Sequence, residues 1–231
     1  PAATVPSNLE FCDADADGFG VFTLTDADVE ITGTLSNLAI SYHETFSDAE
    51  NNLFPIVGEY NNIVAYTQTI YVRVEDTTIS TDCFTYLELI LVVNDVPQIE
   101  TEPMPLEVCD NDTDGFALFD LSLADEEILN GLDPLDFEIS YFETIDNAEE
   151  ETNPIATPLA YTNVSPFTQD IYVRVENGTT QCYNTATLTL IVNELPVLIQ
   201  PDPLELCDDN NTGDEVEEFT LEDSIGQVLN G

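Results

Sequence analysis

Three aspartates at alternate positions follow a cysteine in two places of this 231-residue sequence. The runs are CDADADGF at 12–19 and CDNDTDGF at 109–116, and a degraded copy, CDDNNTGD, stands at 207–214. In the calcium loops of EF-hands, side chains at positions 1, 3 and 5 bind the ion, glycine at position 6 makes a sharp turn and the carbonyl at position 7 adds a ligand. Each run therefore predicts a Ca²⁺ site.

The predicted ligands come from equivalent positions of the three runs. They are Asp13, Asp15, Asp17 and the carbonyl of Phe19, then Asp110, Asp112, Asp114 and the carbonyl of Phe116, and finally Asp208, Asn210 and Thr212. Oxygen-only ligands suit a hard cation, and Ca²⁺ is the expected one outside cells. Because the third set has lost two negative charges, we expect weaker binding there.

The similarity to an EF-hand ends at position 12 of the loop. Leucine stands there, as Leu24 or Leu121, where an EF-hand has a bidentate glutamate. We therefore expect a calcium loop outside the EF-hand fold, completed by another carboxylate. The candidates are Asp26 and Asp28 in the first copy, and Asp120 and Asp125 in the second. The alternative is a solvated acidic turn in a protein that is acidic throughout.

The net charge restricts the partners. The chain has 47 acidic residues against 2 basic ones, a formal charge of −45. Repulsion within so anionic a chain opposes the compact state, and bound cations would offset it. Nucleic acids and anionic membranes are repelled, so neither is an expected partner. We also expect no direct membrane insertion, because no apolar stretch approaches the roughly 18 residues that span a bilayer.

The cysteine–aspartate runs belong to a long repeat. Their cysteines, Cys12, Cys109 and Cys207, stand 97 and 98 residues apart, and TQTIYVRVE at 67–75 returns as TQDIYVRVE at 168–176. A unit of this length is the size of an independent domain. We predict a linker at 1–8, a first repeat at 9–97, a linker at 98–105, a second repeat at 106–196, a linker at 197–203 and the beginning of a third repeat at 204–231.

Alternation of apolar and polar residues predicts the fold class. In the stretch 70–75, Ile and Val face one side while Tyr, Arg and Glu face the other, which is the period of a half-buried strand. Short strands between Asn, Asp, Pro and Gly clusters, in units of about 100 residues, favour an all-β fold of tandem immunoglobulin-like β-sandwich domains. One short helix per domain is expected, at Ser122–Asn130 and, in the first repeat, at Asp26–Thr32.

Five cysteines occupy matching places in the repeats. The simplest pairing is one disulfide per domain, Cys12 with Cys83 and Cys109 with Cys182, with the partner of Cys207 beyond residue 231. Such bonds imply an oxidising, extracellular setting. The alternative is a set of buried, reduced cysteines in a cytosolic protein.

The two basic residues, Arg73 and Arg174, occupy the same place in each repeat. We expect each to form a structural pair with a carboxylate, Glu44 or Glu143, although a ligand-binding role is an alternative. His43 has phenylalanine as its counterpart and is expected at the surface. Since no catalytic arrangement of Ser, His, Cys or Asp recurs, we predict that the chain is not an enzyme.

The motifs as a set resemble a known group of proteins. CDxDxDGFxxFxL, ISYxET, QxIYVRVE and a final LxLxVNxxP are similar to tandem Ig-like repeats of giant cell-surface proteins of Flavobacteria and other Bacteroidota. Those chains are exported by type IX secretion, and some resemble the gliding adhesin SprB. The resemblance covers nearly the whole chain. It implies an extracellular location at the cell surface and neighbouring repeats of one long chain as partners.

The function that these features predict is mechanical. We expect a structural stalk segment of a calcium-stabilised bacterial adhesin or extracellular filament, which mediates surface attachment or gliding. One alternative is a carbohydrate-binding accessory module of a secreted enzyme, against which the absence of Trp counts. Another is a self-assembling filament subunit whose partners are other copies of the chain.

Overall fold

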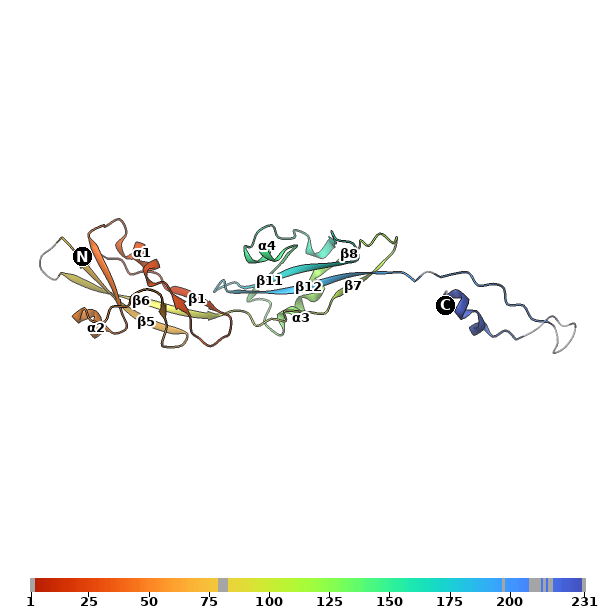
Figure 1. Ribbon diagram of the computed structural model, residues 1–231, viewed down its shortest axis with the longest axis horizontal. Coiled ribbons are helices and arrows are strands. Elements are labelled where there is room, and N and C mark those ends of the chain that lie inside the picture. The colour runs from red at the N-terminus through yellow and green to blue at the C-terminus, as the bar shows by residue number, and fades with distance from the viewer. Residues whose placement is uncertain are drawn as a thin grey trace. The chain divides into compact units, whose positions relative to one another are not determined.

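The structure is a computed structural model that describes residues 3–78, 83–196, 198–207, 213, 215 and 218–229 (Figure 1). In the first repeat the elements are β1 (Leu9–Asp13), β2 (Val21–Phe22), the 3₁₀ helix η1 (Leu24–Ala27), α1 (Asp28–Thr32), β3 (Leu38–His43), α2 (Phe46–Asn51), β4 (Tyr60–Asn61), β5 (Thr67–Asp76) and β6 (Phe84–Asp95). Within these described residues no helix is both long and apolar enough to cross a bilayer.

The second repeat has the same order of elements. They are β7 (Leu106–Asp110), β8 (Leu118–Phe119), η2 (Leu121–Ala124), α3 (Asp125–Leu129), β9 (Phe137–Phe142), α4 (Ile145–Glu149), η3 (Pro158–Ala160), β10 (Tyr161–Thr162), β11 (Thr168–Asn177) and β12 (Tyr183–Glu194). In the third copy the structure describes η4 (Leu221–Ser224) and α5 (Ile225–Val228).

Each complete repeat is a sandwich of a large and a small layer. The large sheet has the order β1-β6-β5-β3 in the first repeat and β7-β12-β11-β9 in the second. The small layer contains a two-stranded sheet, β2-β4 or β8-β10. Most strand pairs are antiparallel, but β1 runs parallel to β6 and β7 runs parallel to β12. The predicted class, tandem immunoglobulin-like β-sandwiches, is confirmed.

The core forms where the alternating strands meet the small layer. Ile70, Val72 and Val74 of β5 are fully buried, as the period of two in this strand predicts. From the small layer, Phe22 and Ile31 belong to the same buried cluster. Burial stabilises each large aliphatic side chain by roughly 1.5–3 kcal/mol relative to exposure, so this cluster holds the layers together.

Each repeat has a second helix that the sequence analysis did not predict. The expected helix is present as η1 with α1 and as η2 with α3. The additional helices α2 and α4 begin after Thr45 and Thr144, whose hydroxyls accept hydrogen bonds from the backbone N–H groups of Asp48 and Asn147. These threonines end the recurring ISYxET motif, which is therefore a strand followed by a helix N-cap.

The two arginines fasten these additional helices to the large sheet. Arg73 is 5% exposed, donates to the carbonyls of Ala49 (3.0 Å) and Glu50 (3.1 Å) at the end of α2, and stacks 3.6 Å above the ring centre of Phe84. Its ion pair is with Glu75, two residues along the same strand. The prediction of Glu44 as the partner was wrong: Glu75 on the same face of β5 pairs with Arg73, and Glu44 accepts a hydrogen bond from the Tyr60 hydroxyl at 3.2 Å.

The second repeat repeats this arrangement. Arg174 donates to the carbonyls of Ala148 (3.0 Å) and Glu149 (3.3 Å) and stacks 3.3 Å above the ring centre of Tyr183. It pairs with Glu176 at 2.6 Å, and not with the predicted Glu143. Positive groups at helix C-termini are favourable, because the last carbonyls of a helix lack partners within the helix.

The expectation that His43 lies at the surface was also wrong. Its side chain is fully buried, Nδ1 lies 2.7 Å from the carbonyl oxygen of Leu53, and Nε2 lies 2.9 Å from the Ser41 hydroxyl. An imidazole and a phenyl ring have similar widths, and Phe142, its counterpart in the second repeat, is buried too. The exchange of His for Phe is therefore one between core residues.

Replacing Arg73 with Met should lower the free energy of unfolding of the first repeat by about 2–3 kcal/mol. The variant keeps the apolar stem but leaves two carbonyls of α2 without a donor and removes the stacked charge. Urea unfolding followed by circular dichroism measures the change. Glu88→Gln, at an exposed position of β6, is the control and should change stability by less than about 0.5 kcal/mol. Equal effects of the two substitutions would contradict the proposed role of Arg73.

Candidate functional site

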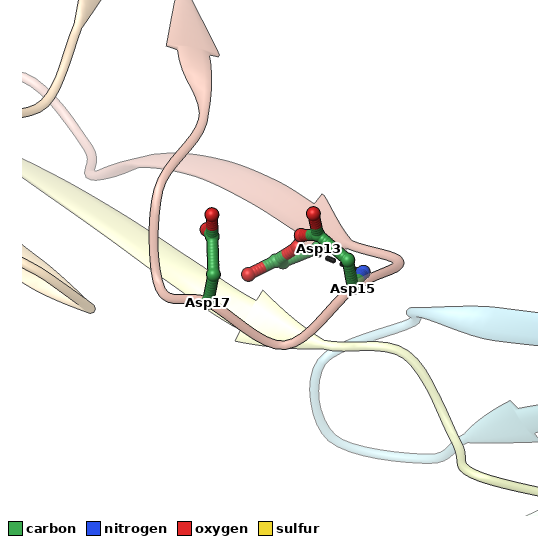
Figure 2. A group of neighbouring side chains, drawn as sticks. All are labelled: Asp13, Asp15 and Asp17. Atoms are coloured by element: carbon green, nitrogen blue, oxygen red, sulfur yellow. Dashed lines mark hydrogen bonds between the residues drawn. The ribbon is translucent and has the colours of Figure 1, made fainter.

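The first aspartate loop is organised around a buried carboxylate. Asp13 ends β1 and is 2% exposed. Its Oδ1 accepts a hydrogen bond from the backbone N–H of Asp15 (3.1 Å), and its Oδ2 accepts one from that of Gly18 (2.7 Å). Asp17 accepts from the N–H of Phe19 at 2.8 Å. Figure 2 shows the three aspartate side chains gathered within the turn of the loop.

The second loop has the same internal hydrogen bonds as the first and one more, from Thr113. Asp110 ends β7 and is fully buried, and it accepts from the N–H groups of Asp112 (3.1 Å), Thr113 (2.7 Å) and Gly115 (2.8 Å). Asp114 accepts from the N–H of residue 116 at 2.8 Å. Two loops with different intervening residues thus adopt one conformation, which points to the aspartates and the glycine as its determinants.

The loops bring three carboxylates close together. In each loop, one ligand oxygen from each of the three aspartates lies within 4.8 Å of the others. An ionised carboxylate has about four lone-pair positions, so the hydrogen bonds from the loop amides leave acceptor capacity for a cation. The donor set is oxygen only, which fits the chemistry of Ca²⁺.

The pKa shifts of the first and second aspartate of each loop have opposite directions. Burial by itself raises the pKa of Asp13 and of Asp110, but hydrogen bonds from Gly18 and Gly115 and from other loop amides outweigh burial, and both pKa values are lowered. The pKa of Asp15 is raised, chiefly by its hydrogen bond with the Asp13 carboxyl and then by the charges of its neighbours. The pKa of Asp112 is raised too, chiefly by the charge of Asp114. The loops therefore hold charge that a cation would relieve.

The structure places the predicted ligands as follows. Asp13, Asp15 and Asp17 converge, as do Asp110, Asp112 and Asp114. Phe19 and Phe116 adjoin their loops through their N–H groups, and ligation by their carbonyls stays a prediction. The third set, Asp208, Asn210 and Thr212, lies outside the residues that the structure describes.

Three of the four candidates for completing the sites accept hydrogen bonds from other side chains. Asp28 accepts from the hydroxyl of Tyr42 at 2.6 Å, and Asp125 accepts from that of Tyr141. Asp120 accepts from the Ser122 hydroxyl at 2.6 Å. Among the described residues, the converging clusters contain the three aspartates of each loop and none of the four candidates, which also include Asp26.

Two buried asparagines hold the loops, and the sequence analysis missed them. Asn62 is 4% exposed; its Nδ2 donates to the carbonyls of Gly18 (2.9 Å) and Val64 (2.8 Å), and its Oδ1 accepts from the N–H of Gly20 (2.6 Å). Asn163 makes the equivalent bonds to Gly115, Ser165 and Ala117 in the second repeat. Each asparagine therefore satisfies three backbone groups, which fixes the end of the loop in one position.

A glutamine supports each asparagine from the adjacent strand. The side-chain carbonyl of Gln68 accepts from the N–H groups of Ile63 (2.6 Å) and Val64 (3.1 Å), and its amide donates to Tyr60 (2.7 Å). Gln169 bonds in the same way to the second repeat's counterparts. The signal in the sequence is the recurrence of YNNIVAYTQ at 60–68 as YTNVSPFTQ at 161–169.

The glycine of each loop is required by space as well as by backbone angle. Gly18 and Gly115 both have φ near +80°. A Cβ on Gly18 would lie 3.0 Å from Ala65 Cβ, and one on Gly115 would lie 2.8 Å from Pro166 Cβ. Glycine therefore serves two requirements in these loops, a left-handed turn and close packing against the neighbouring segment.

The disulfide joins the two repeats. Cys12 of the first repeat bonds to Cys182 of the second, with 5.5 Å between the Cα atoms and 170 residues between them in the chain. The predicted pairs, Cys12 with Cys83 and Cys109 with Cys182, are wrong. Cys109 and Cys207 are exposed thiols, and Cys83 is exposed.

Strand register explains why a disulfide within one repeat is impossible. Cys12 lies opposite Asn94 near the end of β6, whereas Cys83 directly precedes the first residue of that strand. Eleven residues of extended chain span about 36 Å. A disulfide needs Cα atoms roughly 4.4–6.8 Å apart, so the two cysteines of a repeat cannot meet.

The linker after the first repeat is bonded to the second. Asn184 donates to the carbonyl of Pro97 at 3.1 Å, the N–H of Thr187 donates to Thr101 at 2.9 Å, and the N–H of Glu100 donates to Ile128 at 2.9 Å. Cys182 itself is fully buried. Hydrogen bonds between this segment and the second repeat thus accompany the disulfide.

Comparison with protein families identifies both repeats. Residues 8–97 and 105–196 each match the model of the Flavobacterium inter-domain disulphide bond domain. Curated proteins give no match to this chain. The family description agrees with the bond between Cys12 and Cys182. Tandem immunoglobulin-like domains joined by a disulfide indicate an extracellular structural or adhesin-like segment.

Solved structures with detectable likeness include modular animal proteins. Human mucin-like protocadherin EC1-2 is 15% identical, covers 69% of this chain and 85% of its own, and has a TM-score of 0.23. Drosophila N-cadherin EC1-3 is 12% identical, with coverage of 70% and 57% and a TM-score of 0.26. An E-to-A variant of titin domains I67-I69 is 8% identical, with coverage of 83% and 64% and a TM-score of 0.26.

Replacing Asn62 with Asp should lower the free energy of unfolding by about 2–4 kcal/mol. The shape of the side chain is kept, but the carbonyls of Gly18 and Val64 lose their buried donor. Asn61→Asp adds the same charge at the exposed neighbouring position and is the matched control. Thermal and urea unfolding of the two variants measure the difference. Equal losses would show that the added charge, and not the loss of the hydrogen bonds of Asn62, destabilises the repeat.

Removing the disulfide with Cys12→Ser and Cys182→Ser should destabilise the second repeat. With the first repeat folded, Cys12 is held beside Asn94, so unfolding the second repeat opens a loop of about 88 residues up to Cys182. The chain-entropy relation gives about 4–5 kcal/mol for such a loop. Hydrogen exchange of β11 and β12 in urea measures the loss, and Cys109→Ser is the control that should change nothing. Unaltered exchange in the double variant would contradict a stabilising bond.

Proposed function

We propose that this chain, which belongs to the Flavobacterium inter-domain disulphide bond domain family, is a structural stalk segment of a calcium-stabilised bacterial cell-surface adhesin or extracellular filament. The observation that carries the proposal is the Cys12–Cys182 disulfide between consecutive repeats. A bond of this kind transmits tension from one domain to the next without passing through the linker. Such a connection suits a protein that bears mechanical load.

The disulfide also supports the extracellular location. Disulfides persist in oxidising compartments and are rare in the cytosol. The location at the cell surface, export by type IX secretion and a role in surface attachment or gliding rest on the resemblance to giant Bacteroidota surface proteins such as SprB-like adhesins. Within that role the partners are neighbouring repeats of the same chain.

A role without catalysis agrees with how the reactive side chains are used. His43, the single histidine, is buried with both ring nitrogens close to hydrogen-bond partners. Arg73 and Arg174, the two basic residues, are buried and bonded to helix ends. The groups that most often transfer protons or bind anionic substrates are therefore engaged in holding the fold together.

Calcium is the proposed cofactor of the two intact loops. Asp13 and Asp110 are the buried members that the loop amides keep ionised, and the other four aspartates converge on them. A bound Ca²⁺ would neutralise charge next to the disulfide, because Cys12 directly precedes Asp13. Cation binding and covalent linkage would thus stabilise the same end of the repeat.

Adding Ca²⁺ should raise the melting temperature, and EGTA should lower it. The cation binds the folded loops and not the unfolded chain, so stability rises with ligand concentration. The double variant Asp15→Asn with Asp112→Asn should lose most of this response. Glu88→Gln with Glu138→Gln removes the same charge from exposed strand positions and should keep it. Calorimetry across millimolar Ca²⁺ measures the shift, and a melting temperature indifferent to EGTA would overturn the calcium proposal.

In EGTA, the contribution of Asp15 and Asp112 to stability should increase as the pH falls from neutral toward 3.8, opposite in sign to that of Asp13 and Asp110, whose pKa values are lowered. The folded pKa values of Asp15 and Asp112 are raised above 3.8, so their contribution is complete below that pH and is lost as the pH rises through the raised values. Protonation removes the charge that Ca²⁺ neutralises, so the stabilising effect of the ion should fade over the same window. Melting curves at several pH values, with and without Ca²⁺, test both signs. The Asp15→Asn with Asp112→Asn variant should show a weaker pH response.

A further inference from the structure

Three aromatic side chains gather on the outer face of the large sheet in the first repeat. Successive side chains of a strand point to opposite faces, so Ile70 of β5 enters the core and Tyr71 points away from it. Glu88 of β6 lies opposite Tyr71, and Tyr86 lies on the same face two residues earlier. Phe46, the first residue of α2, packs against both tyrosine rings. One surface thus combines three aromatic rings with a carboxylate.

The three rings border a concavity of about 380 Å³. The ring centre of Phe46 lies 5.9 Å from that of Tyr71, with 75° between the planes, and 5.0 Å from that of Tyr86, with 63° between the planes. Phe46 is 46% exposed. The lining of the concavity includes Val5, Phe46, Tyr71, Tyr86, Leu87 and Glu88. Rings of different orientation and one charged group therefore surround the same space.

Tyr86 has a polar atom that the fold does not satisfy. Its hydroxyl oxygen is buried and has no hydrogen-bond partner among the residues that the structure describes. A buried polar atom without a partner lowers the stability of the folded state, because the atom has lost its bonds to water. A residue that carries such a cost points to a use other than stability.

The second repeat folds without this cluster. The counterparts of Phe46, Tyr86 and Glu88 are Ile145, Thr185 and Thr187. By contrast, the arginines that fasten the helices and the asparagines that hold the loops occur in both repeats. The sandwich therefore does not require the three residues, and their presence in the first repeat calls for another explanation.

The lining restricts the chemistry of a ligand to a cation. The faces of aromatic rings are negative, Glu88 adds a negative charge, and the chain as a whole has a formal charge of −45, so anions are repelled. Arg73, opposite Tyr86, is not in the lining, and its charge is paired with Glu75.

The small number of polar groups restricts the ligand further. A sugar or a primary ammonium group loses hydrogen bonds to water on binding and needs partners for its O–H or N–H groups. The polar side-chain groups of this lining are one carboxylate and two tyrosine hydroxyls, and the hydroxyl oxygen of Tyr86 is buried. A quaternary ammonium group has no N–H to satisfy, and aromatic rings bind it through their faces.

We propose that the surface formed by Phe46, Tyr71, Tyr86 and Glu88 binds a quaternary ammonium group, such as the trimethylammonium group of choline. The cation lies against the aromatic rings, and the Glu88 carboxylate balances its charge. None of these residues belongs to the aspartate loops or to the disulfide. The site gives the first repeat a binding function that is independent of the proposed stalk role and of calcium.

Titration of the full chain with choline tests the site. The matched ligand is 3,3-dimethyl-1-butanol, which has the shape of choline without the charge. NMR spectra of chain labelled at Phe and Tyr report which rings respond, and about 150 mM NaCl screens the general attraction of an anionic chain for cations. We expect choline to shift the signals of Phe46, Tyr71 and Tyr86 and to bind about tenfold more tightly than the neutral ligand. Equal affinities would overturn the proposal, because they would show a pocket that does not recognise charge.

Variants separate the ring, the hydroxyl and the carboxylate. Phe46→Ile with Tyr86→Thr introduces the residues of the second repeat and should abolish the response, whereas Tyr86→Phe keeps the ring and should keep the affinity within about twofold. Glu88→Gln should weaken binding about three- to tenfold. Glu138→Gln removes the same charge from an exposed position of β9 and should leave the affinity unchanged.

The outcomes that would contradict the site are specific. Equal effects of Glu88→Gln and Glu138→Gln would show general attraction of cations, and this comparison decides even where the double exchange unfolds the first repeat. Choline that shifts other signals but not those of the three rings would overturn the proposal. Methyl glucoside bound at the same rings as tightly as choline would do so too, because it would assign the surface to a sugar.

Vesicles of phosphatidylcholine distinguish the source of the group. Sedimentation of the chain with these vesicles, lost on Phe46→Ile with Tyr86→Thr, would assign the site to a lipid headgroup. Choline binding without sedimentation would assign it to a soluble trimethylammonium compound. Both results agree with the proposed site and differ only in the molecule that carries the cation.

Discussion

The parallel pairing of the first strand with the end of the last strand is the constraint on which the rest of the molecule depends. In the first repeat it sets Cys12 opposite Asn94 and Asp13 opposite Asp95. The aspartate loop, the cysteine and the outgoing chain therefore meet at one end of the sheet. The other cysteine of a repeat stands at the beginning of the last strand, at the opposite end. The register therefore keeps the two cysteines of one repeat too far apart to bond. A cysteine at this end of the sheet can bond to the neighbouring domain instead, as Cys12 does.

In the described repeats, neighbouring backbone groups stabilise the buried acidic side chains. Backbone amides, and not basic side chains, surround Asp13 and Asp110, because the two arginines are used to fasten helices. The loops that carry these aspartates are held from behind by Asn62 and Asn163, whose three hydrogen bonds each leave little freedom. The resulting loop is fixed and anionic, which agrees with the Ca²⁺ site that we propose.

In the stalk function that we propose, the closeness of the disulfide and the loop has a mechanical use. Force applied along a chain of domains reaches each joint through the linker and through the cross-link, and both begin at the end of the sheet that bears the loop. The carbonyls of Pro97 and Thr101 accept hydrogen bonds from Asn184 and Thr187 of the second repeat. A disulfide and a proposed cation site at the end of the sheet where the chain leaves the repeat would restrict the relative motion that tandem domains otherwise have.

The sequence by itself determined the repeat, the immunoglobulin-like class, the helix that ends at Gly33 or Gly131 and the convergence of the aspartates, because each of these depends on local pattern and period. Only the tertiary structure decided the cysteine pairing, the partners of Arg73 and Arg174 and the burial of His43. It also decided the hydrogen bonds by which Asn62 and Asn163 hold the loops. These depend on strand register and on tertiary contacts, such as those of Asn62 with residues more than 40 positions away and the disulfide across 170 positions, which a periodic pattern does not encode. The matching positions of Cys12 and Cys83 in the repeat favoured a bond between them, but β6 separates the two by its whole length, so Cys12 bonds to Cys182 of the second repeat instead.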